Sequence, residues 1–142
     1  DMQCALGLSQ LKKLPDFIAR RKELSALYDQ LLAPLAPFVR VPQSHNYCDP
    51  ARHLYAVRID FEQAETTRAA VMTALQEKGV GTQVHYTPVH GQPYYIDRYG
   101  VTDLPGAEHY YKHTLSLPLY YGMNDDDVSC VVDTLKTVLE AA

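Results

Sequence analysis

The segment GVGTQVHYTPVHGQPYY, residues 79–95, concentrates two histidines, two prolines and three tyrosines in one short stretch of the chain. Its first half alternates in the way that strands do, and we expect a strand over Thr82–Thr87. The alternation places Val84 and Tyr86 on one side of this strand, and Gln83 and His85 on the other. Pro88 should end the strand, because it has no N–H to donate to a neighbouring strand.

The second half of the segment is expected to be a loop at the rim of a sheet. Gly91 and Pro93 favour further turns before Tyr94 and Tyr95. Tyrosine and histidine side chains combine flat contact area with hydrogen-bonding ends. They suit a ligand that is part ring and part hydroxyl or phosphate, and a sugar nucleotide fits that description.

The sequence on both sides of this segment predicts alternating strands and helices. Upstream, Leu54–Phe61 alternates as a strand, and Glu65–Lys78 has the apolar spacing of a helix that ends where Gly79 can form a left-handed cap. Downstream, we expect a helix over Leu104–Thr114, an extended piece over Leu115–Leu119 and a final helix that begins near Asn124. Asp125–Asp127 would cap this last helix and pair with its dipole rather than bind a metal.

The N-terminal residues predict a long, kinked helical arm. Apolar residues recur from Met2 to Leu14, Pro15 interrupts the run, and Leu24–Leu35 repeats at helical spacing as core or dimer interface. The arm should end at Pro34 and Pro37, before a short strand within Phe38–Val41 and a loop over Pro42–Arg52. Because Asp1 opens directly into an apolar run, we expect the chain to continue a longer polypeptide. The apolar residues of Met2–Leu14 should then be exposed in the isolated chain, or buried against another copy.

These elements predict an α/β fold, more closely an α+β small domain in which helices cover a small sheet. We expect residues 1–36 to form the arm and residues 37–142 to form the domain. A chain of 142 residues with 46% hydrophobic residues can bury one core.

Composition excludes several classes of protein. The net charge is −4 and the thirteen Lys and Arg are dispersed, which argues against binding to nucleic acid. No apolar run approaches the length of a membrane span and no signal peptide is recognisable, so a cytoplasmic location is expected. Cys4, Cys48 and Cys130 are odd in number and lack CxxC spacing, so a disulfide framework or a zinc site is not expected.

Three segments carry a resemblance to a known family. DMQCALGLSQLKKL at residues 1–14, GVGTQVHYTPVHGQPYY at residues 79–95 and YYKHTLSLPLYYGMNDDDV at residues 110–128 together resemble the C-terminal part of the DegT/StrS-type sugar aminotransferases. The likeness covers nearly the whole chain, in order. The sequence around Gln83–Tyr95 is most similar to that of the family's transaminases on the route to pseudaminic acid.

The resemblance implies the small C-terminal domain of a fold type I enzyme that depends on pyridoxal phosphate. Such enzymes work as homodimers and move an amino group from glutamate to a keto-sugar nucleotide, here a UDP-sugar. The family's catalytic lysine and its cofactor-binding residues would all lie upstream of Asp1. The chain would therefore hold no catalytic or cofactor-binding residue and be inactive alone.

Gln83, Val84, His85 and Tyr86 match the family segment that lines the substrate pocket, so the resemblance implies that they contact the sugar nucleotide. His90 is a further candidate. The alternative is that one ring packs under the other in a tight turn. A metal site at His85 and His90 is disfavoured, because no third ligand follows at a recognisable spacing. Paired tyrosines at 110–111 and 120–121 are interpreted as packing rather than as a stacking platform.

Two other functions remain open from the sequence. The chain could be a free-standing, non-catalytic module that binds sugar nucleotides or dimerises with a partner. It could also derive from a relative that replaces the catalytic lysine with histidine and dehydrates sugars. Residues upstream of Asp1 would decide between the last possibility and the aminotransferase.

Overall fold

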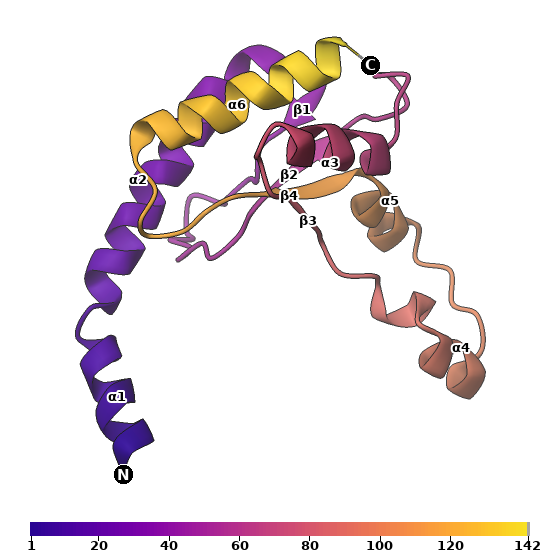
Figure 1. The fold of residues 1–142 in the computed structure, drawn as a ribbon. Coiled ribbons are helices and arrows are strands. Elements are labelled where there is room, and N and C mark those ends of the chain that lie inside the picture. The colour runs from indigo at the N-terminus through magenta and orange to yellow at the C-terminus, as the bar shows by residue number, and fades with distance from the viewer. Residues whose placement is uncertain (142) are drawn as a thin grey trace.

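In the computed structural model, which describes residues 1–141, two helices in tandem lead into a small sheet with helices around it (Figure 1). The helices are α1 (Met2–Leu11), α2 (Leu14–Leu32), α3 (Arg68–Glu77), α4 (Pro93–Tyr99), α5 (Pro105–His113) and α6 (Asp125–Glu140), with short 3-10 turns η1 (Ala33–Leu35) and η2 (Val89–Gly91). The strands are β1 (Val39–Arg40), β2 (Tyr55–Ile59), β3 (Gln83–Val84) and β4 (Thr114–Leu117). The α/β prediction of a small sheet covered by helices and preceded by a helical arm is confirmed.

The sheet is antiparallel throughout, in the order β1-β2-β4-β3. Tyr55 and Val57 of β2 are buried, and their partners across the strand pair are Leu117 and Leu115 of β4. The alternate residues of β2 are half-buried and lie on the opposite face. This strand therefore has the alternation that its sequence predicts, with one face toward the core and one, called here the outer face, turned away from it.

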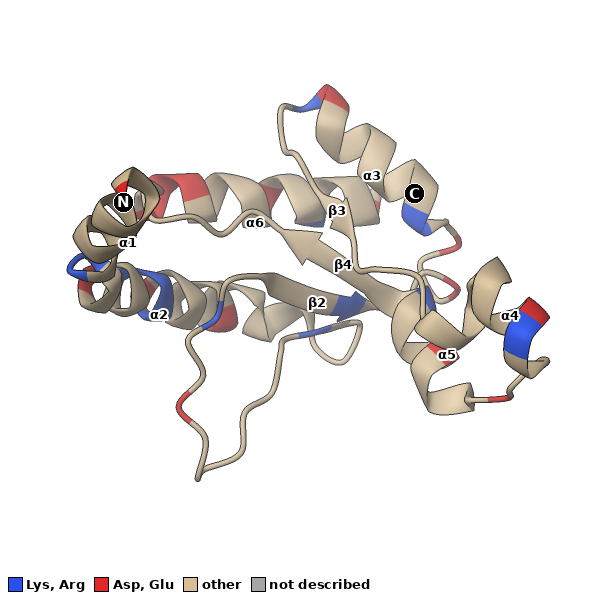
Figure 2. Ribbon diagram, turned by 90° about the horizontal axis from the view of Figure 1, so that it is seen from below, with Lys and Arg blue, Asp and Glu red and all other residues tan. Residues whose placement is uncertain are grey.

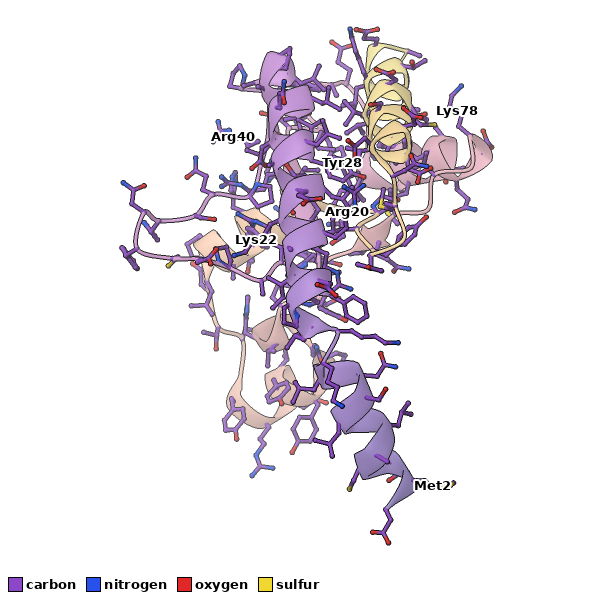
Figure 3. All side chains as sticks on the ribbon, turned by 90° about the vertical axis from the view of Figure 1, so that its left-hand side faces the viewer. Met2, Arg20, Lys22, Tyr28, Arg40 and Lys78 are labelled. Atoms are coloured by element: carbon purple, nitrogen blue, oxygen red, sulfur yellow. The ribbon has the colours of Figure 1, made fainter. Side chains whose placement is uncertain are left out.

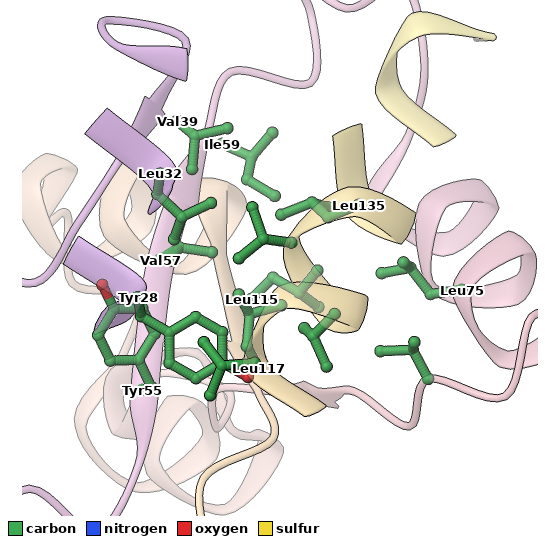
Figure 4. Packing of buried hydrophobic residues seen from close by; sticks show 14 of the residues in the cluster. Tyr28, Leu32, Val39, Tyr55, Val57, Ile59, Leu75, Leu115, Leu117 and Leu135 are labelled. Carbon is green, nitrogen blue, oxygen red and sulfur yellow. The ribbon is translucent and has the colours of Figure 1, made fainter. Parts of the chain in front are cut away.

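The core lies between the inner face of the sheet and the packed helices α2 and α6 (Figures 1 and 4). Leu24, Tyr28 and Leu32 of α2 are fully buried, as is Leu135 of α6. The apolar stripe predicted in the arm is thus core along its second half. Tyr28 and Tyr55 stack with 4.5 Å between ring centroids, and Figure 4 shows the two rings side by side.

Residues at the start of α6 join this helix to α2. The Asn124 side chain accepts a hydrogen bond from the Asp127 N–H, and the Asp127 carboxylate accepts one from the Asn124 N–H, each at 2.8 Å. This capping box satisfies amide groups that the helix cannot pair internally. Arg20 of α2 donates to the Asp125 carboxylate and to the Met123 carbonyl, both at 2.9 Å. The predicted capping role of the acidic run is confirmed.

Helix α1 does not pack against the core between the sheet and helices α2 and α6. Met2 at its tip is 88% exposed, and Leu6, Leu8 and Leu11 are each more than half exposed. In Figure 3 the side chains of α1 project from the lower end of the arm, with Met2 farthest from the sheet. The predicted exposure of these apolar residues in the isolated chain is confirmed.

Helix α3 begins later than predicted. The sequence predicted a helix from Glu65, but Glu65 has a positive φ of 52° and the helix begins at Arg68. Thr67 explains the difference, because its side chain accepts a hydrogen bond from the Ala70 N–H and so caps the helix. At the other end, Gly79 has a φ of 82°, which confirms the predicted left-handed cap.

The segment at residues 79–95 differs most from its predicted structure. The strand is limited to Gln83–Val84 rather than Thr82–Thr87, because β3 pairs with β4 only at these two residues. The loop predicted over residues 88–95 is replaced by the 3-10 turn η2 and helix α4. Pro93 occupies the first turn of α4, where its missing N–H costs nothing, so this proline starts a helix instead of a turn.

Among residues 1–141, no helix combines the length and the apolar character that crossing a membrane would require.

Candidate functional site

His85 lies directly after β3 on the outer face of the sheet. The register of β3 fixes this position, because Gln83 pairs with Ser116 on the outer face and His85 follows two residues later. The imidazole is half-buried and meets the Tyr110 ring edge to face, with 5.6 Å between centroids. Its Nδ1 atom is buried and has no hydrogen-bond partner among residues 1–141. A buried nitrogen without a partner is unusual and points to a group that these residues do not provide.

His85 lines a cleft of about 480 Å³ on this face of the sheet, called here the His85 cleft. This volume lies within the range of small-molecule sites in proteins, which is roughly 300–1,000 Å³. The loop between β1 and β2 forms one wall, and the outer face of β2 forms the floor. The lining residues are Val41, Pro42, Gln43, Pro50, Ala51, Arg52, His53, Leu54, Ala56, Arg58, His85 and Tyr110.

The polar groups of the His85 cleft are mostly basic or neutral. Arg52 and Arg58 bring two guanidinium groups, and His53 brings a second imidazole. Arg52 also shapes the wall, since it donates to the Pro42 carbonyl at 3.0 Å and to the Ser44 hydroxyl at 2.6 Å. No carboxylate lines this cleft in the described part of the chain. The arrangement suits a ligand that carries a negative charge together with an apolar or ring portion.

Four of the five residues predicted to bind substrate lie outside this cleft, namely Gln83, Val84, Tyr86 and His90. Gln83 and Val84 are exposed on the edge strand β3, and Val84 is 37% exposed. Tyr86 is 82% exposed, and its ring centroid lies 6.0 Å from that of His85. The structure therefore brings Tyr86 beside His85, with its hydroxyl end available to a ligand or to another polypeptide.

His90 lies in a different environment from His85. It belongs to the turn η2, and its side chain is 15% exposed and lies 3.6 Å from the Glu108 carboxylate of α5. His90 lines a second cleft of about 520 Å³, the His90 cleft. The other residues of the His90 cleft are mostly apolar or aromatic: Pro88, Val89, Tyr95, Tyr99, Gly100, Thr102, Leu104 and Ala107.

Arg68 of α3 holds the C-terminal end of α5, beside the segment that carries His90. Its guanidinium group stacks over the Tyr111 ring at 4.6 Å and donates a hydrogen bond to the Tyr111 carbonyl. A side-chain hydrogen bond with Thr87, together with Arg68, lowers the pKa of Tyr111. The packing interpretation of the tyrosine pair at 110–111 therefore holds for Tyr111, whereas Tyr110 faces His85 in the cleft.

Sequence reasoning missed the basic residues of the His85 cleft. The sequence placed Arg58 in a predicted strand and Arg52 at the end of a predicted loop, and it marked neither of them, nor His53, as a site residue. The signal was present in the alternation, because Arg58 in β2 and His85 directly after β3 both lie on the outer face. What the sequence lacked was the strand order, which places both strands beside β4. No group of three side chains suited to a metal ion occurs among the residues described.

Comparisons with known proteins identify what the chain resembles. The sequence profile of the DegT/DnrJ/EryC1/StrS aminotransferase family matches residues 1–136. The "Spore coat polysaccharide biosynthesis protein SpsC" of Bacillus subtilis (strain 168) is 42% identical over 149 residues, an alignment that covers 100% of this chain and 37% of that protein.

Solved structures show the same fold. PseC of Helicobacter pylori, described as an aminotransferase involved in the biosynthesis of pseudoaminic acid, superimposes with a TM-score of 0.89 at 26% identity, over 99% of this chain and 37% of PseC. The sugar aminotransferase Spr1654 of Streptococcus pneumoniae, solved in its PLP form, gives a TM-score of 0.83 at 28% identity, over 96% of this chain and 34% of its own. The chain thus spans little more than a third of the length of the relatives that it matches.

Proposed function

The chain belongs to the DegT/DnrJ/EryC1/StrS aminotransferase family, and from this premise we propose that it is the small domain of a sugar aminotransferase that depends on pyridoxal phosphate. The complete protein would take an amino group from glutamate and transfer it to a keto-sugar nucleotide, with a UDP-sugar as the first substrate to test. The resemblance to PseC supports the precursor of pseudaminic acid as the first such sugar. The resemblance to SpsC supports a polysaccharide precursor of the same chemical class.

We further propose the division into an arm at residues 1–36 and a small domain at residues 37–142. In the complete enzyme the arm would lead from a larger domain, and two copies would form a homodimer. The exposed apolar residues of α1 support this proposal, because a stable protein rarely leaves such a row uncovered.

His85 and the cleft that it lines are the main support for the proposed binding of a sugar nucleotide. The buried Nδ1 without a partner lies beside a cleft of small-molecule size that basic side chains line. A sugar nucleotide would bring hydroxyl groups within reach of the imidazole and phosphate oxygens within reach of Arg52 or Arg58. Gln83, Val84, Tyr86 and His90, which lie outside the cleft, would contact the edges of the bound ligand.

The lysine that such enzymes require does not line the cleft at His85; Lys112 lines a separate cleft of about 350 Å³ together with His90. The bound cofactor would supply an electron sink, and a lysine would hold it in the resting enzyme; no lysine lines the His85 cleft or the His90 cleft. The lysine that holds the cofactor would then come from another part of the complete protein. The part played by this chain is to bind the sugar nucleotide, orient it and exclude water around it.

The proposal can be tested in the complete natural protein that contains these residues. His85→Asn should raise the KM for the keto-sugar nucleotide by about tenfold, because the imidazole would lose its contact with the sugar. His45→Asn is the matched control, since His45 lies on an exposed loop and stacks only on Tyr47. Transfer of nitrogen from labelled glutamate to the sugar would be the assay.

Equal kinetic constants for His85→Asn, His45→Asn and the unmodified protein would contradict a substrate role for His85. Absence of any amino transfer with a range of keto-sugar nucleotides would contradict the proposed reaction itself. The same assay distinguishes the two outcomes, because the first requires measurable amino transfer and the second is its absence.

A non-catalytic binding or dimerisation module is the second candidate, because the exposed apolar residues of α1 would also suit a partner chain. The intact mass of the native polypeptide, before and after borohydride reduction with pyridoxal phosphate, separates the two candidates. One reduced cofactor on a lysine of a much heavier chain would support the aminotransferase. A native chain of this size without an adduct would support the module.

A further inference from the structure

Two arginines lie directly opposite each other on the outer face of the sheet. Arg40 of β1 is the cross-strand partner of Arg58 of β2. Like charges in this position destabilise a strand pair unless something compensates them. Among residues 1–141, neither guanidinium group has an ion-pair partner within 4.0 Å, and Arg40 Nε donates only to the Pro37 carbonyl, at 3.3 Å. In Figure 2 the blue segment of β2 lies on the side toward α5.

Helix α5 adds two imidazoles to this pair. His109 and His113 lie one turn apart with 4.2 Å between ring centroids. His113 Nδ1 lies 2.7 Å from the His109 carbonyl, which can only accept, so Nδ1 donates and Nε2 is left for another partner. Both imidazoles and both guanidinium groups line one small cleft, called here the Arg40 cleft.

The Arg40 cleft is small and positively charged. Its volume is about 130 Å³, and its other lining residues are Pro37, Phe38, Ile59 and Asp60. Asp60 is the one carboxylate among them, and its Oδ1 already accepts the Gln63 N–H at 3.0 Å. Two guanidinium charges minus one carboxylate charge leave a net charge of +1 when both histidines are neutral.

We propose that the Arg40 cleft binds a single phosphate or similar oxyanion. Its volume corresponds to roughly four molecules of liquid water, which suits one oxyanion and is too small for a nucleotide. Paired guanidinium groups bind such anions through charge-assisted, often bidentate hydrogen bonds. Protection of an edge strand would explain Arg40 alone, but it does not explain Arg58 opposite it or the two imidazoles above.

The anion can come from either of two sources. Arg58 lines both the Arg40 cleft and the larger His85 cleft, so a ligand in the His85 cleft could extend a phosphate group into the smaller one. Free inorganic phosphate could also bind there by itself. The proposal does not require the aminotransferase reaction, and its test measures no catalytic activity.

The test is calorimetric titration of the complete natural protein with inorganic phosphate, at constant ionic strength. Arg40→Gln and Arg58→Gln should each weaken phosphate binding by about tenfold or more, because each removes a charged donor. Arg98→Gln is the matched control, since Arg98 lies on α4 and donates to Tyr94 outside the cleft. It should leave the affinity unchanged.

Thermal unfolding provides a second measurement. Phosphate should raise the unfolding temperature of the unmodified protein and of Arg98→Gln, but not that of the double variant Arg40→Gln/Arg58→Gln. Without phosphate, Arg40→Gln should unfold at the same temperature as the unmodified protein or slightly higher, because a repulsion is removed. A cooperative unfolding transition measured for each variant would also show that the variant is folded.

Comparison of UMP with inorganic phosphate identifies the source of the anion. Tighter binding of UMP, weakened by Arg58→Gln, would indicate a phosphate that extends from the His85 cleft. Equal or weaker binding of UMP would indicate free phosphate. The proposal would be overturned if phosphate did not bind saturably, or if Arg98→Gln weakened binding as much as Arg40→Gln and Arg58→Gln.

Discussion

Tyr28 and Tyr55 show how two polar side chains can occupy the centre of the core. Their hydroxyl groups donate to the Pro118 carbonyl at 2.9 Å and to the Asp29 carboxylate at 2.5 Å, while their rings stack on each other. Burial raises the pKa of both phenols far above the usual value, and the hydrogen bond to Asp29 adds to this effect for Tyr55. Both side chains therefore keep their protons to a higher pH in the folded chain than in the unfolded chain.

This burial makes stability depend on pH in the alkaline range. Above about pH 10 the unfolded chain loses the phenolic protons that the folded chain retains, so the unfolded state binds fewer protons. The free energy of unfolding should be insensitive to these tyrosines below about pH 9 and should fall above pH 10, by up to about 1.4 kcal/mol per pH unit for each tyrosine. Urea unfolding at a series of pH values measures this slope.

Tyr28→Phe is the informative variant for the alkaline slope, and Tyr47→Phe, on an exposed loop, is the control. The first should make the slope shallower and the second should leave it unchanged. An identical slope in both variants would show that Tyr28 ionises as easily in the folded chain as in the unfolded one.

At the scale of elements, the connection between α3 and β3 determines where the candidate site segment starts. Gly79 has a φ of 82°, and the Val80 N–H donates to the Leu75 carbonyl at 2.9 Å, which ends the helix and returns Val80 to the core. Residues other than glycine adopt this conformation only at a cost of about 1–2 kcal/mol.

Gly79→Ala should therefore lower the free energy of unfolding by about 1–2 kcal/mol. The added methyl group meets no atom within 4 Å, so the loss comes from the backbone conformation alone. Gly81→Ala is a matched control, because Gly81 also has open space around it but no positive φ. Denaturant titrations of the two variants compare them directly, and equal losses would contradict a conformational cause.

For the whole molecule, the two halves of the arm differ in what they contact. The second half of α2 is core, whereas α1 is exposed along its length. In the isolated chain, Leu24→Ala should lower the free energy of unfolding by about 2–5 kcal/mol, because it leaves a cavity beside the sheet. Leu8→Ala, the same substitution on a side chain that is 65% exposed, should change it by less than about 0.5 kcal/mol.

Urea unfolding of the isolated chain at low protein concentration provides this comparison. A loss from Leu8→Ala as large as that from Leu24→Ala would mean that α1 is covered in solution, by a second copy of the chain. In that case the loss should decrease as the protein is diluted, because dissociation removes the contact.

Much of the fold follows from local patterns in the sequence. Pro15 interrupts the arm, Asn124 caps the final helix and Gly79 ends α3, because each residue acts on its own backbone or on amides a few positions away. Helix α4 was missed for a related reason: Pro93 both ends strands and starts helices, and the sequence alone did not separate these two roles.

The sequence alone determined the family, the helical arm and the importance of the segment around His85, because these depend on residue types and their spacing. Only the tertiary structure decided which side chains surround His85. Strand order brings β2 next to β4 and β4 next to β3, so Arg52, Arg58 and Tyr110 lie near His85 although they are distant in sequence. The same pairing sets Arg40 opposite Arg58. Cross-strand register depends on the whole sheet, and no local pattern contains it.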